Sequence, residues 1–355
     1  MKILVTGATG CLGSAVANHL SAKGNAVTGT GRNLDLAKHL SPGITFVAAE
    51  LSDEKTVANL VQEHDSIVHC AGLSTLWGSY RDFQVANVEA TANLLNAALN
   101  NKIENFVFIS TPSLYFDFKN RLNIKEDDPL THKLVNSYAM SKLACEQLVK
   151  DAQNKGLASV VLRPRAIFGP NDRALMPRLL RLANKGWLPL IDNGKAQIDL
   201  TYVDNVAHAV ALALENLPDV SGKIYNISNG EPITVSSLFN KIISEFHLNA
   251  RCISIPYDLA YAAALAMEAL ASRAPGCPEP LLTKYTVGVI GRSQTLSIEA
   301  ASRDLNYKPI VSLEDGIRHT ASCFNSGNRV QNIGISNVRK VQKVQEIDQP
   351  VQNNA

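Results

Sequence analysis

Short apolar runs alternate with longer amphipathic stretches through the first two thirds of the chain. Helix-like segments at 12–23, 53–63, 84–100 and 137–154 separate runs rich in Val, Ile and Phe, which we predict to be buried strands. These runs are KILVTG, AVTGTG, ITFVAAEL, DSIVHCAG, NFVFIST and ASVVLRP. Strands that alternate with crossover helices indicate a parallel sheet covered on both faces. Because such crossovers are right-handed, the sequence predicts an α/β fold with a doubly wound Rossmann sheet.

The rhythm of strands and helices breaks after residue 170, where Pro and Gly become frequent. We therefore expect a Rossmann domain with the catalytic residues at 1–170, and the chain to re-enter it around 196–230. A smaller C-terminal α+β substrate domain is expected at 171–324, over the carboxyl edge of the sheet, where doubly wound folds bind ligands. The segment 325–355 is polar and low in aromatic residues, which predicts a disordered tail.

Composition and charge exclude several classes of function. Lys and Arg total 34 against 32 acidic residues in 355, too balanced a charge to attract nucleic acid. The six cysteines are far apart and show no metal-ligand spacing, which is typical of reduced thiols in a cytoplasmic protein and predicts no metal site. The apolar stretch 259–272 is too short to cross a bilayer, so we expect no transmembrane segment, and peripheral membrane contact by 257–272 is the alternative to burial.

The first strand runs into a glycine loop, TGATGCLG at 6–13. Gly7 allows the tight turn, Gly10 lets the backbone approach a pyrophosphate, and Gly13 permits close packing of helix on strand. Cys11 and Leu12 would then offer their backbone N–H groups at the helix amino terminus. Since the loop lies between a strand and a helix, it predicts a dinucleotide site.

The end of the second strand bears on which dinucleotide binds. Gly31 stands where NAD-binding proteins usually carry an acidic residue, and Arg32 follows it. A guanidinium grips a 2′-phosphate in a bidentate way, so we expect NADP(H) to be preferred, with NAD(H) as the alternative. The competing interpretation is that Arg32 is only a solvated loop cation.

A second motif, SYAMSKLACEQLV, places Tyr138 and Lys142 one turn apart on one face of a helix. A cation about 4 Å from the phenol would stabilise the phenolate by roughly 4 kcal/mol. We therefore expect Lys142 to bring the pKa of Tyr138 towards neutrality, where general acid–base catalysis is effective. Upstream, FVFISTPSLY leaves Thr111 and Ser113 at the end of a buried strand, where a hydroxyl can donate to a substrate carbonyl.

Together these motifs resemble the extended short-chain dehydrogenase/reductases of the NAD-dependent epimerase/dehydratase superfamily, most of all their 3β-hydroxysteroid dehydrogenase group. The resemblance covers about residues 2–322. It also rests on VHCAG at 68–72, NVEATANLL at 87–95, LRPRAIFGP at 162–170 and TYVDNVAHAVALALE at 201–215.

The resemblance implies roles for individual residues. Tyr138 matches the catalytic acid/base, Lys142 the lysine that tunes it and holds the nicotinamide ribose, and Thr111 the catalytic Ser/Thr, with Ser113 as its substitute. Further cofactor contacts would come from Glu50, Leu51, Ala71, Gly72, Pro164 and Ile167. The family also implies a homodimer through the helices at 84–100 and 137–154.

We therefore predict an NADP(H)-dependent oxidoreductase that moves hydride to or from a lipophilic substrate such as a sterol, a 3-oxoacyl compound or an aromatic ring ketone. Expected pocket walls are Leu73, Leu76, Trp77, Tyr80, Leu134, Tyr257, Tyr261 and Met267. The main alternative is a nucleotide-sugar epimerase with tightly bound NAD, whose diphosphate would need Arg173, Arg178, Arg251 or Arg292. A non-enzymatic NADP-binding sensor is a further alternative, which the retained Tyr138 and Lys142 disfavour.

Overall fold

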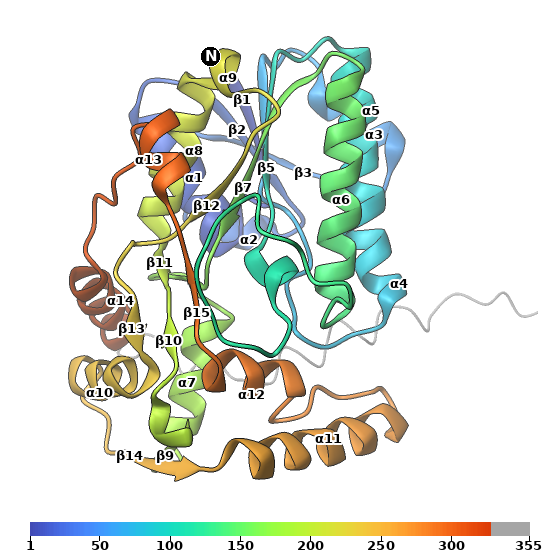
Figure 1. Cartoon of the computed structure of the whole chain (residues 1–355). Helices are drawn as coiled ribbons and strands as arrows, with labels where there is room; N and C mark the ends of the chain where they lie inside the picture. The colour runs from blue at the N-terminus through green and yellow to red at the C-terminus, as the bar shows by residue number, and fades with distance from the viewer. Residues whose placement is uncertain (328–355) are drawn as a thin grey trace, which may run out of the picture.

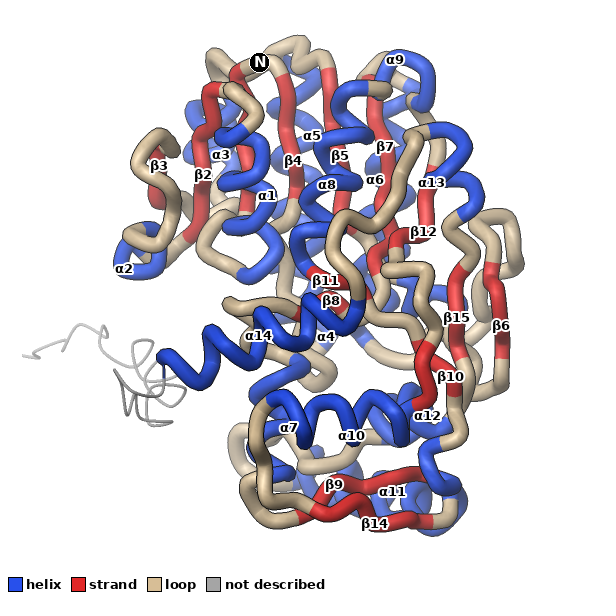
Figure 2. The backbone as a smooth tube through the Cα atoms, turned by 90° about the vertical axis from the view of Figure 1, so that its left-hand side faces the viewer, coloured by secondary structure: helices blue, strands red, loops and turns tan. Residues whose placement is uncertain are grey.

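The computed structural model describes residues 1–327 and is built on a seven-stranded parallel sheet (Figures 1 and 2). From edge to edge the strands are β12 (Ile224–Ile227), β7 (Ala158–Pro164), β5 (Asn105–Ile109), β4 (Ser66–His69), β1 (Lys2–Thr6), β2 (Ala26–Gly31) and β3 (Thr45–Ala48). Every neighbouring pair is parallel, and Ile3 of β1 lies beside Val27 of β2 and Ser66 of β4. The strand order reverses direction between β1 and β4. Parallel sheets of this kind bind ligands at that switch point.

Helices cover both faces of the sheet, as the sequence predicts (Figure 1). On one face α1 (Cys11–Ala22) packs against α8 (Val203–Glu215), and on the other α5 (Ala90–Asn100) lies between α3 (Glu54–Val61) and α6 (Ser137–Asn154). Each face has its own apolar core, because alternate strand residues point to opposite sides. The short helices α2 (Leu34–Ala37), α9 (Leu217–Val220) and α13 (Glu299–Asp304) complete this half.

Two helices matter most for the site, because their amino termini lie at the carboxyl edge of the sheet. The Asn136 side chain caps α6 by accepting a hydrogen bond from the Ala139 N–H at 2.9 Å. This cap fixes where the helix begins, and so the positions of Tyr138 and Lys142 in its first turns. By contrast, α1 starts at Gly10 with no side-chain cap, so its first N–H groups stay free for a ligand. The predicted helix at 84–100 begins as a π-helical turn, η1 (Gln84–Glu89), before α5.

Three small sheets, most of whose strands follow residue 170, lie below the first sheet (Figure 2). Their strands are β6 (Arg121–Ile124), β8 (Ile167–Phe168), β9 (Trp187–Ile191), β10 (Gln197–Ile198), β11 (Thr201–Tyr202), β13 (Ile233–Thr234), β14 (Arg251–Ile255) and β15 (Gln294–Leu296). The helices are α4 (Tyr80–Phe83), η2 (Pro112–Tyr115), α7 (Leu175–Ala183), η3 (Asp192–Gly194), α10 (Val235–Glu245), α11 (Tyr257–Arg273), α12 (Lys284–Gly291) and α14 (Leu313–Gly327).

The two halves are interleaved along the chain. Strand β12 lies at the edge of the large sheet and α8 covers one of its faces, although both follow residue 170. In return, β6 leaves the first half and pairs with β15 of the second. Helix α14 extends to Gly327, inside the segment predicted to be a tail, and 328–355 lie outside the described residues.

Two negative observations concern residues 1–327 alone. None of their helices combines the length and the apolar character that crossing a membrane requires. Within the same residues, no three His, Cys, Asp or Glu side chains gather as metal ligands would.

Candidate active site

The glycine loop has the tight geometry that a phosphate cradle needs. Gly7 has φ +69°, and a Cβ there would lie 2.8 Å from the N of Ala71. A Cβ on Gly13 would lie 2.1 Å from the Gly7 carbonyl oxygen, so only glycine lets helix α1 approach the strand this closely. The Gly10 N–H closes the turn on the same carbonyl at 2.8 Å. The bare amino terminus of α1 therefore fits the diphosphate of a dinucleotide.

At the far end of the expected cofactor site, Arg32 and Glu50 face each other across the ends of β2 and β3. Their side chains are 78% and 52% exposed and are 3.5 Å apart. A Cβ on Gly31 would lie 2.7 Å from the Thr9 hydroxyl, so a side chain at this position would require Thr9 to shift. Leu51, next to Glu50, is buried, and its carbonyl accepts a hydrogen bond from Asn93 at 3.0 Å.

The nicotinamide end of the expected site is formed by the segment after β4 and the first turns of α6. A Cβ on Gly72 would lie 3.2 Å from Asn87 Oδ1 and 4.0 Å from Lys142 Nζ, so the glycine lets the backbone run close to both side chains. The Lys142 side chain is only 5% exposed and lies over the Phe108 ring, with Nζ 4.2 Å from its centre. Among residues 1–327 no carboxylate pairs with it. Such a buried, unneutralised ammonium is suited to holding ligand hydroxyls.

Tyr138 lies one turn before Lys142, and its phenol faces the Thr111 hydroxyl. Burial raises the pKa of Tyr138 above its ordinary value, and the hydrogen bond with Thr111 offsets part of that rise. The expectation that Lys142 lowers the pKa of Tyr138 is not met in the protein alone. Lys142 is not among the groups that act on the phenol, because its ammonium points towards Phe108 and Gly72. The four-residue spacing correctly predicted that Tyr138 and Lys142 share one face of the helix, but it could not predict how deeply each side chain is buried.

The expected hydroxyl pair is present and continues into the second half of the protein. Thr111 caps η2 and donates to Ser113 Oγ at 3.0 Å. The Ser113 hydroxyl is in turn 2.7 Å from the Tyr285 hydroxyl on α12. Tyr285 was missed by sequence reasoning, because it is 172 positions away and belongs to no recognisable motif. A row of hydroxyls therefore runs from Tyr138 through Thr111 and Ser113 to Tyr285.

The segment after β7 forms the remaining side of this cluster. Pro164 is paired with Ile227 of β12, and Ile167 with Thr201 of β11, so the backbone between them is held from both sides. Arg165, between the two expected cofactor residues, is only 4% exposed, and its guanidinium interacts with the Tyr285 hydroxyl. The sequence reasoning attached no role to Arg165.

Two of the expected pocket residues, Tyr257 and Tyr261, join Phe116 and Phe118 in an aromatic wall next to Tyr285. The Phe116 ring lies edge-on to Tyr285 at 5.7 Å, Phe118 is 5.1 Å from Phe116, and Tyr261 of α11 is 5.9 Å from Phe118. Tyr257 stacks on Tyr261 at 5.8 Å. This wall runs away from the hydroxyl row and is suited to an apolar or aromatic group.

Other residues from the expected pocket walls lie elsewhere. Trp77 donates from its ring N–H to the Cys277 carbonyl at 2.9 Å and so joins the loop after β4 to the segment before α12. Tyr80 is 43% exposed on α4. Two of the cations considered for a diphosphate are already paired: Arg178 with Glu279, and Arg292 with Asp192.

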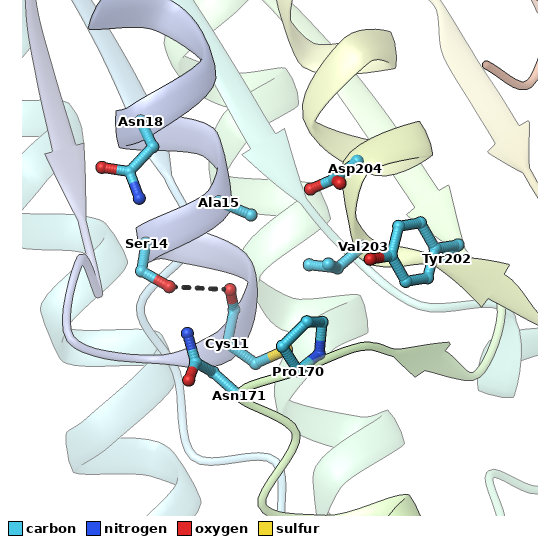
Figure 3. A pocket seen from close by; sticks show the side chains of 9 residues that line it. All are labelled: Cys11, Ser14, Ala15, Asn18, Pro170, Asn171, Tyr202, Val203 and Asp204. Atoms are coloured by element: carbon cyan, nitrogen blue, oxygen red, sulfur yellow. Dashed lines mark hydrogen bonds between the residues drawn. The ribbon is translucent and has the colours of Figure 1, made fainter. Parts of the chain in front are cut away.

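A separate hollow of about 140 Å³ opens beside the glycine loop, at the junction of α1, α8 and the turn after β8 (Figure 3). Its lining is Cys11, Ser14, Ala15, Asn18, Pro170, Asn171, Tyr202, Val203 and Asp204. It contains none of the hydroxyl row and neither Tyr138 nor Lys142. Burial raises the pKa of the Cys11 thiol to about 12, so this thiol is protonated and unreactive at neutral pH.

Residues 3–228 match the model of a family described as the NAD dependent epimerase/dehydratase family. The chain belongs to this family. The matched residues include the glycine loop, the hydroxyl row up to Ser113, and Tyr138 with Lys142. The resemblance inferred from the motifs is thereby confirmed.

Curated relatives of the family extend over most of the chain. It is 37% identical to the uncharacterized protein YbjS of Escherichia coli over 91% of this chain and 97% of that protein. It is 34% identical to a 2-alkyl-3-oxoalkanoate reductase of Shewanella oneidensis (88% and 84%) and 26% identical to a mouse decarboxylating sterol-4-alpha-carboxylate 3-dehydrogenase (91% and 91%). The chain is accordingly an oxidoreductase of the family, related to its 3β-hydroxysteroid dehydrogenase group.

Solved structures of the family share the fold. A UDP-glucose 4-epimerase of Thermotoga maritima superimposes with a TM-score of 0.74 at 22% identity, covering 92% of this chain and 100% of that one. This likeness confirms the doubly wound α/β architecture.

Proposed function

We propose that the protein is an NADP(H)-dependent reductase of lipophilic ketones. The observation that carries the proposal is the grouping of the Tyr138 phenol, the Thr111 hydroxyl and the buried, unneutralised Lys142 ammonium beside Gly72. The grouping supplies a proton donor, a second hydrogen-bond donor for one carbonyl oxygen, and a cation for sugar hydroxyls. The names of the relatives, which reduce oxoalkanoates or oxidise sterols, support the same reaction class.

In this reaction the nicotinamide of the bound cofactor supplies the hydride that forms the new C–H bond. Tyr138 gives its phenolic proton to the carbonyl oxygen, while Thr111 donates a hydrogen bond to the same oxygen and stabilises its growing negative charge. The product is the alcohol, and the phenolate regains its proton from solvent. Because burial raises the pKa of Tyr138, the phenol is protonated at neutral pH, which suits the direction of reduction.

Two features support NADP(H) rather than NAD(H). Gly31 has no carboxylate with which to select NAD, and the exposed Arg32 can turn from Glu50 towards a 2′-phosphate. The aromatic wall from Tyr285 to Tyr261 supports a lipophilic substrate. A nucleotide-sugar epimerase is less well supported, since Arg178 and Arg292 are paired with acids.

The test follows NADPH and NADH absorbance with a panel of 3-oxoacyl esters, sterol ketones and aromatic ring ketones. We expect turnover with NADPH, and a loss of about 10²- to 10⁴-fold in kcat for Tyr138→Phe. Lys142→Met should lose activity as well, whereas Lys150→Met, which removes the same charge from an exposed position on α6, should not. No turnover of any ketone, together with NAD that stays bound through purification, would refute the reductase and favour the epimerase.

A further inference from the structure

Proton donation from Tyr138 would leave a phenolate with no cation beside it among residues 1–327. The Lys142 ammonium lies over the Phe108 ring, 4.2 Å from its centre, and does not act on the phenol. Burial raises the pKa of Tyr138, because this position disfavours negative charge. Donation is therefore easier if a second proton reaches the phenol oxygen as the first one leaves.

The hydroxyl row behind Tyr138 offers a path for that second proton. The Tyr138 phenol is hydrogen-bonded to Thr111, Thr111 to Ser113 at 3.0 Å, and Ser113 to Tyr285 at 2.7 Å. Thr111 and Ser113 are only 6% and 4% exposed, so bulk water has little access to the middle of the row. Each hydroxyl can both donate and accept, which allows every bond in the row to reverse its direction. The path from α6 to α12 is therefore continuous.

A buried cation lies at the outer end of this row. The Arg165 side chain is 4% exposed, and its guanidinium interacts with the Tyr285 hydroxyl. Its Nε has no hydrogen-bond partner among the described residues. Asp199 is the acidic group that acts on Arg165, but one Asp199 oxygen accepts the Leu296 N–H at 2.6 Å and the other has no partner within residues 1–327. Negative charge on the Tyr285 oxygen would thus face a cation, whereas negative charge on Tyr138 would not.

The two ends of the row are close enough to influence each other. Tyr285 is among the groups whose negative charge would act on the Tyr138 phenol. Two negative oxygens on so short a row would repel each other, so the row holds one negative charge at a time. That single charge is stabilised best at the end where the cation lies. The arrangement therefore favours a shift of the charge from Tyr138 to Tyr285.

We propose that Tyr285 is the outer end of a proton relay that restores the Tyr138 proton during ketone reduction. As the Tyr138 O–H bond breaks and its proton bonds to the carbonyl oxygen, Thr111 turns its own proton from that oxygen to the Tyr138 oxygen. The Ser113 proton then replaces that of Thr111, and the Tyr285 proton replaces that of Ser113. The charge rests on the Tyr285 oxygen beside Arg165 until a proton from solvent neutralises it. Tyr285 is only partly buried, so solvent can reach it.

This inference rests on the proposed reductase activity and adds the route by which its proton is supplied. The hydride still passes from the nicotinamide to the carbonyl carbon, and the relay carries protons only. Tyr285 does not touch the reacting carbonyl in this scheme, since it acts through Ser113 and Thr111. Its hydroxyl should therefore affect the rate of reduction and leave the binding of the ketone almost unchanged.

The test measures loss of NADPH absorbance in a single turnover, with the full chain in excess and the ketone of the panel that turns over fastest. Tyr285→Phe removes the hydroxyl and keeps the ring, which lies edge-on to Phe116 at 5.7 Å. The rate should fall about 10- to 100-fold, less than in Tyr138→Phe, because the proton donor itself remains. The steady-state KM for the ketone should stay nearly the same. Tyr307→Phe is the matched control, since it removes a buried hydroxyl that donates to the Ser228 carbonyl at 3.0 Å, and it should leave the rate unchanged.

Measurements in mixtures of H₂O and D₂O separate a relay from a merely structural role of the hydroxyl. The wild-type rate should fall along a curve as the fraction of D₂O rises, because several protons move together. In Tyr285→Phe the fall should become linear, because the Tyr138 proton alone moves. A packing defect would slow the reaction without changing the shape of this dependence.

Ser113→Ala interrupts the row at its middle and gives an independent check. When it is combined with Tyr285→Phe, the rate should be no lower than in the slower of the two single variants, because one break already stops the relay. Losses that multiply would mean that the two hydroxyls act separately, and would overturn the relay.

Failure of the relay and failure of the reductase give different results. A single-turnover rate unchanged in Tyr285→Phe, or a dependence on D₂O that stays curved, would overturn the relay. The reductase would still stand in that case, provided that Tyr138→Phe loses its activity. No reduction of any ketone by the wild-type protein would refute the reductase and the relay together.

Discussion

The buried ion pair between Glu146 and Arg163 joins the catalytic helix α6 to strand β7, and its removal should be the most damaging change outside the reacting groups. Arg163 donates to both carboxylate oxygens of Glu146, at 2.9 and 2.6 Å, and the two side chains are only 3% and 8% exposed. Ser110, directly before Thr111, also donates to Glu146 at 2.5 Å. Arg163 bonds Tyr115 as well, at 2.5 Å.

The size of the effect follows from this geometry. Glu146→Gln keeps the volume but leaves the Arg163 guanidinium buried with no opposite charge, which costs about 3–5 kcal/mol when one partner of a buried pair is removed. The double change Glu146→Leu with Arg163→Met removes both charges and fills the space with apolar atoms. It should therefore cost less than the single change, because no charge is left unpaired.

The assay is urea unfolding at fixed pH, with circular dichroism and tryptophan fluorescence required to give coincident transitions. Glu314→Gln provides the control, because Glu314 pairs with Arg318 on the surface, at 59% and 50% exposure, and should change the free energy of unfolding by no more than about 0.5 kcal/mol. The reasoning fails if Glu146→Gln lowers the free energy of unfolding by less than about 1 kcal/mol. It also fails if the double variant lowers it by as much as Glu146→Gln does.

Three further outcomes are expected. Gly13→Ala should weaken NADP⁺ binding by calorimetry at least about 100-fold, since its Cβ would lie 2.1 Å from a loop carbonyl, while Gly43→Ala, with its nearest neighbour at 3.6 Å, should not. Arg32→Ala should raise KM for NADPH about 10-fold without raising KM for NADH, and Glu50→Gln should lower KM for NADPH. If the ratio of KM for NADPH to KM for NADH is unchanged in both variants, Arg32 makes no contact with a 2′-phosphate. Burial raises the pKa of Asp199 to about 6, above its value in the unfolded chain, so between these two values the folded state holds a proton that the unfolded state has lost. The free energy of unfolding should therefore fall by roughly 1–3 kcal/mol between about pH 4 and pH 7. In urea titrations Asp199→Asn should abolish this fall.

The features that the sequence predicted well are local ones. The glycine loop, the strand-end hydroxyls and helix α6 at 137–154 depend on neighbours within a few positions, where periodicity and capping leave clear signals. Because all parallel strands end at one edge, their positions at strand ends were also enough to predict that residues after β1, β2, β4, β5 and β7 would gather there.

The features that the sequence could not predict depend on burial and on contacts between distant segments. A spacing of four placed Tyr138 and Lys142 on one face, but it says nothing of how deeply each group is buried, and burial decides the direction of both pKa shifts. Tyr285 meets Ser113 across 172 positions, and no local pattern marks that meeting. Arg165 was passed over because its burial, and its contact with Tyr285 across 120 positions, are properties of the packed interior alone.

This difference in predictability corresponds to a division of roles in the enzyme. The first half carries the groups that we propose to bind dinucleotide and move a proton, and these lie within the residues that match the family model. The second half adds Tyr285 on α12, which contacts the hydroxyl row at Ser113, and Tyr261 on α11, which contacts the Phe118 ring. Both residues lie outside the range that matches the family model. We therefore infer that the local motifs set the reaction and that long-range packing sets the choice of substrate. Substitutions in α11 should accordingly change which ketone is reduced, while substitutions at Tyr138 should remove reduction of every ketone alike.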